Sequence, residues 1–328
     1  MAESGAMAAE KADVEQFQQQ IGELREEIGK VIVGNREVID GALTCMLAGS
    51  HALLEGVPGL GKTLAVRTLA RILSVRFRRV QGTPDLMPAD IIGANVFSMS
   101  SGQFTLHEGP VFTDLLLVDE VNRMPPRTQA ALLEAMEERQ VTIDGVPRPL
   151  SPLFTVIATQ NPLEFEGTYP LPEAELDRFA VKITIGYPEA ADEETILARH
   201  HDAIEMLLPS EVDRGAIQPE ELAAGRGEAV RVQVEPALLG YIASIVRRTR
   251  EWPAIALGAS PRAAIHLMQI AKAIAAIEGR DYLLPDDVKR VAPPVLRHRL
   301  IIRPEADLEG VTSDQVIADV LASVPVPK

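Results

Sequence analysis

Short apolar runs alternate with amphipathic stretches through the first half of the chain. Apolar or β-branched runs at 52–54, 77–81, 114–119, 153–159 and 181–185 predict buried strands. Helical spacing of apolar residues marks 14–28, 36–47 and 65–72. Strands that alternate with helices in this way predict an α/β fold, with a parallel, doubly wound sheet covered on both faces.

Two segments depart from this alternation. Residues 95–109 alternate apolar and polar positions around Ser101 and Gly102, and residues 140–150 do the same around Asp144 and Gly145. Both patterns predict β-hairpins, the second with a strong turn signal. The pattern alone leaves open whether they merely decorate the sheet edge or have a function of their own.

The pattern changes after residue 188. Residues 191–208, 236–250, 261–279 and 286–296 have helical spacing, and prolines mark several of the helix starts. The polar stretch 209–227 gives no clear prediction. We therefore expect a flexible tail over 1–12, an α/β domain over 13–188 that carries both hairpins, and an all-helical domain over 189–328.

Composition narrows the class of protein. The 328 residues are 46% hydrophobic and 24% charged, as in soluble globular proteins, and no apolar run reaches the about 20 residues that cross a bilayer. Cys45 is the only cysteine, which excludes an intrachain disulfide and a thiolate metal cage and favours the cytoplasm. The net charge of −15 and 4% aromatic content make nucleic acid an unlikely general partner, although a local basic channel stays open.

A phosphate-binding loop follows the first predicted strand. It consists of Gly56, Val57, Pro58, Gly59, Leu60, Gly61, Lys62 and Thr63. Glycines let backbone N–H groups close around phosphate oxygens, and the following helix adds positive charge at its N-terminus. Lys62 is placed to reach the β- and γ-phosphates, and Thr63 to ligate Mg²⁺. Alone, the loop predicts a nucleotide site, with a ligand-free Gly-rich turn as the alternative.

Polar side chains follow two further predicted strands. Asp119 and Glu120 end the run 114–119, at the strand end where α/β proteins bind ligands. Asp119 suits Mg²⁺ coordination through water, and Glu120 suits activation of the water that attacks a γ-phosphate. Asn161 follows 153–159, where its amide could contact the γ-phosphate or that water. The competing interpretation makes Asn161 and Pro162 turn residues.

Two arginines have more than one interpretation. Arg178 follows a segment rich in Pro and Glu, where an internal ion pair is the simpler explanation and an arginine finger the alternative. Arg262 lies in the first turn of a predicted helix, where positive charge is unfavourable. That cost mildly favours an anionic partner.

Taken in order, these motifs resemble the AAA+ ATPases, and specifically the MoxR family in the group that contains the magnesium chelatases. The resemblance runs from about residue 31 to 298. Its most specific stretches are 83–88, 119–126, 132–137, 171–179 and 258–262. It implies a P-loop core with a helical lid domain.

The resemblance also implies a role for each motif. Lys62 and Thr63 fall on the Walker A pair, Asp119 and Glu120 on the Walker B pair, Asn161 on the first sensor, Arg178 on the trans-acting finger and Arg262 on the second sensor in the lid. Val33 and Gly34 join the nucleotide-binding residues. Arg123 lies in a family motif without an assigned role.

The function implied is hydrolysis of ATP with Mg²⁺ between neighbouring subunits of a ring, usually a hexamer. The two hairpins match the insertions that push on a client protein, and a partner with a von Willebrand factor A domain is common in the family. A nucleic-acid-translocating motor is the alternative, against which the acidic balance weighs. An assembly factor that binds ATP without turnover is a third, against which the intact Glu120 argues.

Overall fold

The computed structural model describes residues 18–57, 59–100, 102–162, 167–202 and 217–327. The predicted tail at 1–12 lies outside this part of the chain. Residues 18–31 form a helix that ends three residues later than the spacing predicts, and the predicted start at 14–17 lies outside the described residues. Within the described residues, no helix is both long enough and apolar enough to cross a membrane.

The five predicted strands form one parallel sheet. They are β1 (Ala52–Gly56), β2 (Phe77–Gln81), β5 (Leu115–Asp119), β8 (Thr155–Gln160) and β9 (Val181–Ile185). Their order across the sheet is β2-β5-β8-β1-β9, so β1 lies between β8 and β9. Gln81 pairs with Asp119 and Glu55 with Gln160, which brings the carboxyl ends of four strands to one edge. The predicted parallel α/β fold is confirmed.

Alternate residues of each strand enter different cores, so both faces of the sheet are covered. Leu115 and Leu117 pack with α2 (Arg36–Ala48) and α3 (Lys62–Ile72). Leu116 and Val118 pack on the other face with α4 (Pro88–Ile92) and α5 (Pro126–Glu138). The four strand residues are fully buried, which explains why β5 is a continuous apolar run.

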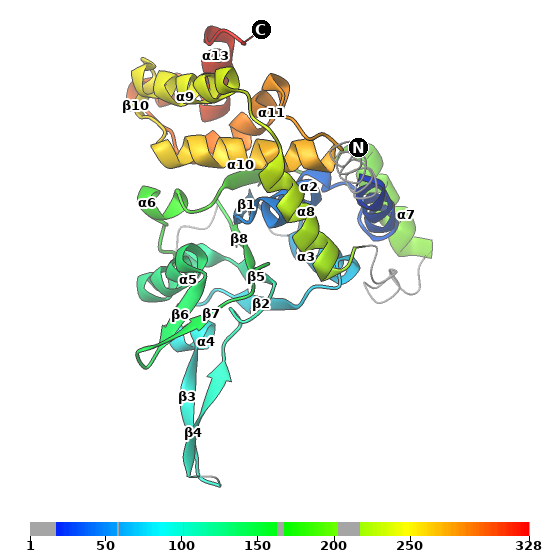
Figure 1. The fold of residues 1–328 in the computed structure, drawn as a ribbon, viewed down its shortest axis with the longest axis vertical. Coiled ribbons are helices and arrows are strands. Elements are labelled where there is room, and N and C mark those ends of the chain that lie inside the picture. Colours follow the sequence, from blue (N-terminus) through cyan, green and yellow to red (C-terminus); the bar gives the residue numbers. More distant parts are fainter. Residues whose placement is uncertain (1–17, 58, 101, 163–166, 203–216, 328) are drawn as a thin grey trace, which may run out of the picture.

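The structure has a hairpin at each of the two predicted positions. The first is β3 (Gly93–Ser98) with β4 (Gln103–Glu108), which projects farthest from the body in Figure 1. The second is β6 (Gln140–Ile143) with β7 (Val146–Pro149), closed by Asp144 and Gly145 at φ 49° and 78°. The Asn95 amide donates to Asp144 Oδ2 at 2.7 Å and joins the two hairpins.

Helices dominate the chain after β9, as the spacing predicts. They are α7 (Ala190–Asp202), α8 (Pro219–Arg231), α9 (Pro236–Glu251), α10 (Pro261–Ile277), α11 (Pro285–Leu296), α12 (Pro304–Leu308) and α13 (Ser313–Ser323). A short antiparallel pair, β10 (Ile255–Leu257) with β11 (Ile301–Ile302), interrupts them. The sequence patterns missed α8, α12, α13 and this strand pair. The helix predicted over 191–208 corresponds to α7, and its predicted end, residues 203–208, lies outside the described residues.

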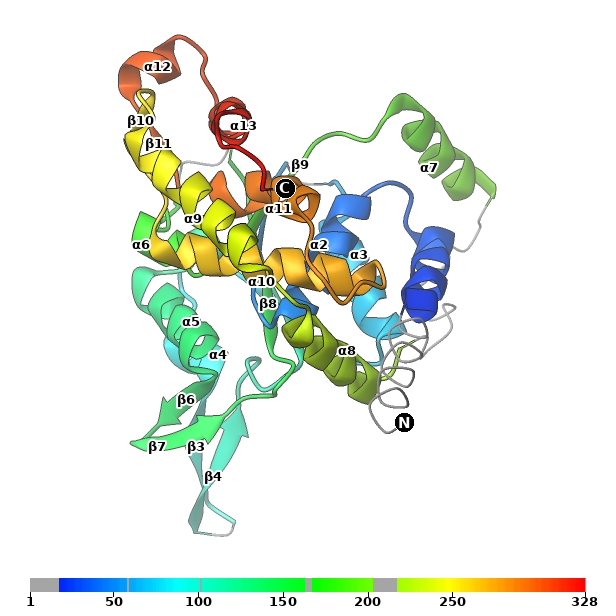
Figure 2. The same ribbon diagram turned by 45° about the horizontal axis from the view of Figure 1, so that its top comes forward.

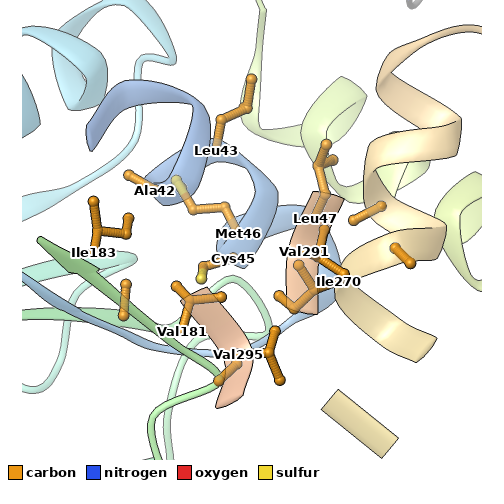
Figure 3. Packing of buried hydrophobic residues seen from close by; sticks show 14 of the residues in the cluster. Ala42, Leu43, Cys45, Met46, Leu47, Val181, Ile183, Ile270, Val291 and Val295 are labelled. Atoms are coloured by element: carbon orange, nitrogen blue, oxygen red, sulfur yellow. The ribbon is translucent and has the colours of Figure 1, made fainter. Parts of the chain in front are cut away.

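One hydrophobic core joins the sheet to the lid helices. Figure 3 shows Met46 and Leu47 of α2 between Val181 and Ile183 of β9 and Ile270, Val291 and Val295 of α10 and α11. The lid helices α8 and α10 pack against α2, and α9 and α11 pack against α10, as both ribbon views show (Figures 1 and 2). The boundary predicted at residues 188 and 189 falls between β9 and α7.

Candidate active site

The phosphate loop connects β1 to α3 at the carboxyl edge of the sheet. Gly59 and Gly61 have φ of 87° and 72°, a conformation that favours glycine, and Gly61 caps α3. A Cβ placed on Gly59 would meet no atom within 4 Å, so space is open in front of the loop. Gly56, Val57 and Leu60 lie in the described part of the loop, whereas Pro58 lies outside it.

Lys62 and Thr63 begin α3, where the helix N-terminus adds partial positive charge. Lys62 Nζ donates to the carbonyl of Gly56 at 2.6 Å. Burial lowers the pKa of Lys62, while the carboxylates of Asp119, Glu120 and Glu55 act in the opposite direction. Thr63 Oγ1 donates to Asp119 Oδ2 at 3.2 Å, so the structure brings the Walker A and Walker B positions together.

Asp119 ends β5 and also accepts from an arginine that the sequence reasoning missed. Arg79 on β2 donates from Nε to Asp119 Oδ2 at 2.6 Å. Because β2 and β5 are neighbours, Arg79 lies two residues before the Gln81–Asp119 pair and on the same face of the sheet. The sequence holds no signal for this contact until the strand order is known.

Glu120 is held in an unusual backbone conformation, with φ 57° and ψ 52°. Its N–H donates to Thr159 Oγ1 at 3.0 Å, and Arg123 Nη1 donates to its Oε2 at 3.1 Å. Gly82 lies so close that an added Cβ would be 2.2 Å from the Glu120 carbonyl. A non-glycine residue in the left-handed region costs about 1 kcal/mol or more, so surrounding contacts must hold it there. Arg123 thus contacts the Glu120 carboxylate directly.

The remaining predicted residues of this edge lie close to the loop. Asn161 is 7% exposed and directly follows β8. Val33 and Gly34 precede Asn35, whose side-chain amide donates to the Leu60 carbonyl in the loop at 2.8 Å. A Cβ on Gly34 would be 3.0 Å from Asp192 Oδ2, so the start of α7 covers this segment. Asn35 is a site residue that the sequence patterns did not single out.

Arg178 and Arg262 lie together at the opposite edge of the sheet. Arg178 Nε is 3.2 Å from Glu137 Oε2, and Arg262 Nη2 donates to Glu137 Oε1. Glu137 of α5 is thus the anionic partner of Arg262 within the chain. Arg178 forms an internal ion pair with the same carboxylate, which is one of the two interpretations that its sequence position allowed.

The same edge has a cavity of about 200 Å³. Its lining includes both arginines, Glu137 and His51, the residue before β1. β1 has five residues and is therefore roughly 17 Å long, which separates this cavity from the phosphate loop. Both ribbon views place α5, α6 (Glu173–Leu176) and the start of α10 on one side of the molecule and α3 on the other (Figures 1 and 2). The structure does not bring either arginine to the loop of its own chain.

The donor groups at the carboxyl edge fit a nucleotide with Mg²⁺. The loop offers positive-φ glycines and Lys62, and the Thr63 hydroxyl and Asp119 carboxylate are hard oxygen donors 3.2 Å apart. In the described part of the chain, no group of three or more His, Cys, Asp and Glu residues could hold a metal. Mg²⁺ needs no such group, because it takes one or two protein ligands together with phosphate and water.

The sheet order, the loop and the acidic pair after β5 define a P-loop nucleoside triphosphatase with a helical lid. Residues 51–181 match the ATPase family associated with various cellular activities (AAA), and residues 247–320 match the AAA lid domain. A crystal structure of a candidate ATPase from Cytophaga hutchinsonii is similar, with a TM-score of 0.91, 41% identity and coverage of 98% of this chain and 99% of that one.

Two named relatives specify the family. The chain is 40% identical to Chaperone MoxR1 of Mycobacterium tuberculosis, over 92% of this chain and 81% of the relative. It is 32% identical to Protein MoxR of Methylorubrum extorquens, over 91% of each. The protein belongs to the MoxR family of AAA+ ATPases, which confirms the resemblance in the motifs.

Proposed function

We propose that this protein hydrolyses ATP with Mg²⁺ at the subunit interfaces of a homo-oligomeric ring, a hexamer, and uses the energy to remodel a client protein as a chaperone does. The observation that carries the proposal is the division of the site between two edges. Lys62, Thr63, Asp119 and Glu120 converge at the carboxyl edge, whereas the arginines lie at the amino edge. Neighbouring subunits that pack edge to edge would unite the two halves.

At the carboxyl edge, the loop N–H groups and Lys62 bind the phosphates. Thr63 and, through water, Asp119 hold Mg²⁺, which neutralises phosphate charge when bound. Glu120, oriented by Arg123, accepts a proton from the attacking water. Asn161 donates to that water or to the γ-phosphate, and Val33 and Gly34 border the nucleotide.

At the amino edge, Glu137 holds Arg178 and Arg262 in the separate subunit. A neighbour's γ-phosphate carries more negative charge than this one carboxylate, so both arginines are expected to leave Glu137 for the phosphate in the assembled ring. Arg262 then acts on the neighbour alongside Arg178. Its position beside Arg178 supports this role and argues against a role in its own pocket.

The first hairpin supplies the surface for a client. Phe97, Met99 and Phe104 are 50%, 94% and 72% exposed near its tip, and the two phenylalanine rings pack edge to face with centroids 5.3 Å apart. Such a cluster on a projecting element is typical of a protein-binding site. We propose that it contacts apolar segments of a client, and that a protein with a von Willebrand factor A domain is a partner.

Replacing the carboxylate of Glu120 tests the catalytic assignment. Glu120→Gln should lower the turnover number of ATP by about 10²- to 10⁴-fold, because it removes the general base. The dissociation constant of a fluorescent ATP analogue should stay unchanged, because the loop and Lys62 are intact. Glu134→Gln, at an exposed position on α5, is the control and should keep its turnover. Undiminished turnover in Glu120→Gln would refute the assignment.

The alternative, a nucleic-acid-translocating motor, makes a different prediction. DNA would then stimulate the ATPase, and the stimulation would fall steeply with added salt. With a net charge of −15, we expect no such stimulation.

A further inference from the structure

Arg299, a buried arginine of the lid, donates several hydrogen bonds to the segment that carries Arg178. The Arg299 side chain is 2% exposed and lies between α11 and β11. It donates to Asp177 Oδ1 at 2.6 Å and to the carbonyls of Asp177, Phe179 and Ala180 at 3.0, 2.6 and 3.0 Å. These contacts lie on both sides of Arg178 in the chain, so one guanidinium group fixes the backbone that presents the finger.

Other lid residues complete this contact. Ser260 Oγ donates to the second carboxylate oxygen of Asp177 at 3.0 Å, and His298 Nε2 donates to the Phe179 carbonyl at 3.0 Å. Arg299 Nη2 also donates to His266 Nδ1 at 2.6 Å. Burial lowers the pKa of His266 to about 3, which leaves the ring neutral and able to accept this bond.

These hydrogen bonds form a network that links the backbone next to Arg178 to the backbone next to Arg262. Ser260 is the N-cap of α10, two residues before Arg262, and Asp177 is the residue before Arg178. The Ser260–Asp177 hydrogen bond therefore fixes the start of the lid helix against the finger segment. Burying a guanidinium has a large desolvation cost and seldom adds stability over an apolar side chain. A fixed geometry is what such an arrangement supplies.

We propose that Arg299 is a positioning residue that makes the finger segment part of its own subunit's lid, so that Arg178 and Arg262 approach the neighbour's nucleotide as one unit. This proposal rests on the function proposed above. Movement of a lid in one subunit would then be transmitted directly to the ATP site of the next. The network acts through Arg178 and contacts no nucleotide itself.

Arg299→Lys tests the proposal, because lysine keeps the charge but loses the five-donor fork. We expect turnover to fall by about 100-fold through displacement of the finger. The dissociation constant of a fluorescent ATP analogue should not change, because the variant's own loop lies at the other edge of the sheet. Mixing Arg299→Lys with Lys62→Ala protein should restore turnover at interfaces that pair an intact loop with intact arginines.

The control is Arg280→Lys. Arg280 forms a comparable fork with Asp287 in the same lid, at 2.7 Å for both contacts. It follows the far end of α10, whose 17 residues span about 25 Å from the finger segment. This variant should keep its turnover per folded subunit, even if its melting temperature falls.

The outcomes separate this inference from the proposed function. If Arg178→Ala mixed with Lys62→Ala also fails to recover turnover, the shared interface site is refuted. If that pair recovers turnover and the Arg299→Lys pair does not, or if Arg299→Lys weakens ATP binding, the positioning role is refuted. Should Arg299→Lys not fold, Asp177→Asn, which removes the charged acceptor alone, must show the same recovery, and its failure refutes the role.

Discussion

Arg79 and Asp119 form an ion pair at the candidate metal site. Arg79 is half exposed, and such pairs contribute up to about 1 kcal/mol, so the pair should compete weakly with Mg²⁺ for Asp119. Arg79→Gln should lower the Mg²⁺ concentration for half-maximal ATPase by up to about fivefold and leave the rate at saturating Mg²⁺ unchanged. Arg78→Gln, on the other face of β2, is the control. An unaltered Mg²⁺ dependence would contradict this competition.

The buried histidines His51 and His266 should make the folded protein less stable in mild acid. Val156 N–H donates to His51 Nδ1 at 2.9 Å, and burial lowers the pKa of His51 and of His266 to about 3. Below pH about 6.5 the unfolded chain binds protons that the folded chain does not. The free energy of unfolding should therefore decrease as the pH is lowered below about 6.5. For each histidine the decrease approaches about 1.4 kcal/mol per pH unit.

Urea unfolding at pH 7.5, 6.5 and 5.5 measures this dependence. His266→Gln removes one of the titrating rings, so its free energy of unfolding should fall less steeply with pH than that of the parent protein. Equal slopes in the two proteins would show that His266 does not contribute.

Residues that act within one short motif could be predicted from the sequence, whereas residues that act across strands could not. Lys62 and Thr63 follow the loop glycines directly, and Glu120 follows β5, so the chemistry of each is local in the chain. Arg79 reaches Asp119 from another strand, and its role depends on the sheet order. The roles assigned to Arg178 and Arg262 came from resemblance, and only the structure places them together on Glu137.

At the scale of elements, α8 shows where the sequence pattern failed. Its Gly225 and Gly227 lower helix propensity, and the surrounding stretch is polar. The helix forms because Leu222 and Ala229 are buried in the core shared with α2 and α10. The strands β1, β5 and β8 were predictable because they are buried on both faces and appear as nearly continuous apolar runs. In β2 only Val80 is buried, and in β9 buried and less buried positions alternate, so these two strands carry a weaker signal.

The first hairpin is the element for which client binding can be tested. Phe97→Ser combined with Phe104→Ser should abolish the stimulation of ATPase by reduced, carboxymethylated α-lactalbumin, used here as an unfolded client. Basal ATPase should stay near the parent value, because both rings are at least half exposed and belong to the hairpin β3–β4, which projects away from the body in Figure 1. Val146→Ser, at a 46% exposed position on the second hairpin, is the matched control. Loss of stimulation in the control alone would assign the client to the second hairpin.

At the scale of the whole molecule, binding and catalysis should separate. The loop, Lys62 and Asp119 are assembled within one chain, so ATP should bind to a single subunit. The arginines lie about one strand length away at the other edge, a distance that side-chain movement cannot cover. Under the proposed function, turnover should therefore depend on contact between subunits, which the sequence indicates only through the family resemblance of its motifs.

The concentration dependence of ATPase activity tests this separation. Turnover per chain should rise with protein concentration and then saturate, and the separated subunit should be about 10³-fold or more slower, the usual contribution of an arginine finger. Sedimentation over the same range should show assembly at the concentrations where turnover rises. The affinity for an ATP analogue should vary much less. Arg178→Ala and Arg262→Ala should assemble and yet stay at the low rate. If turnover per chain is constant where sedimentation shows single subunits, each chain completes its own site, and the edge-to-edge arrangement is wrong.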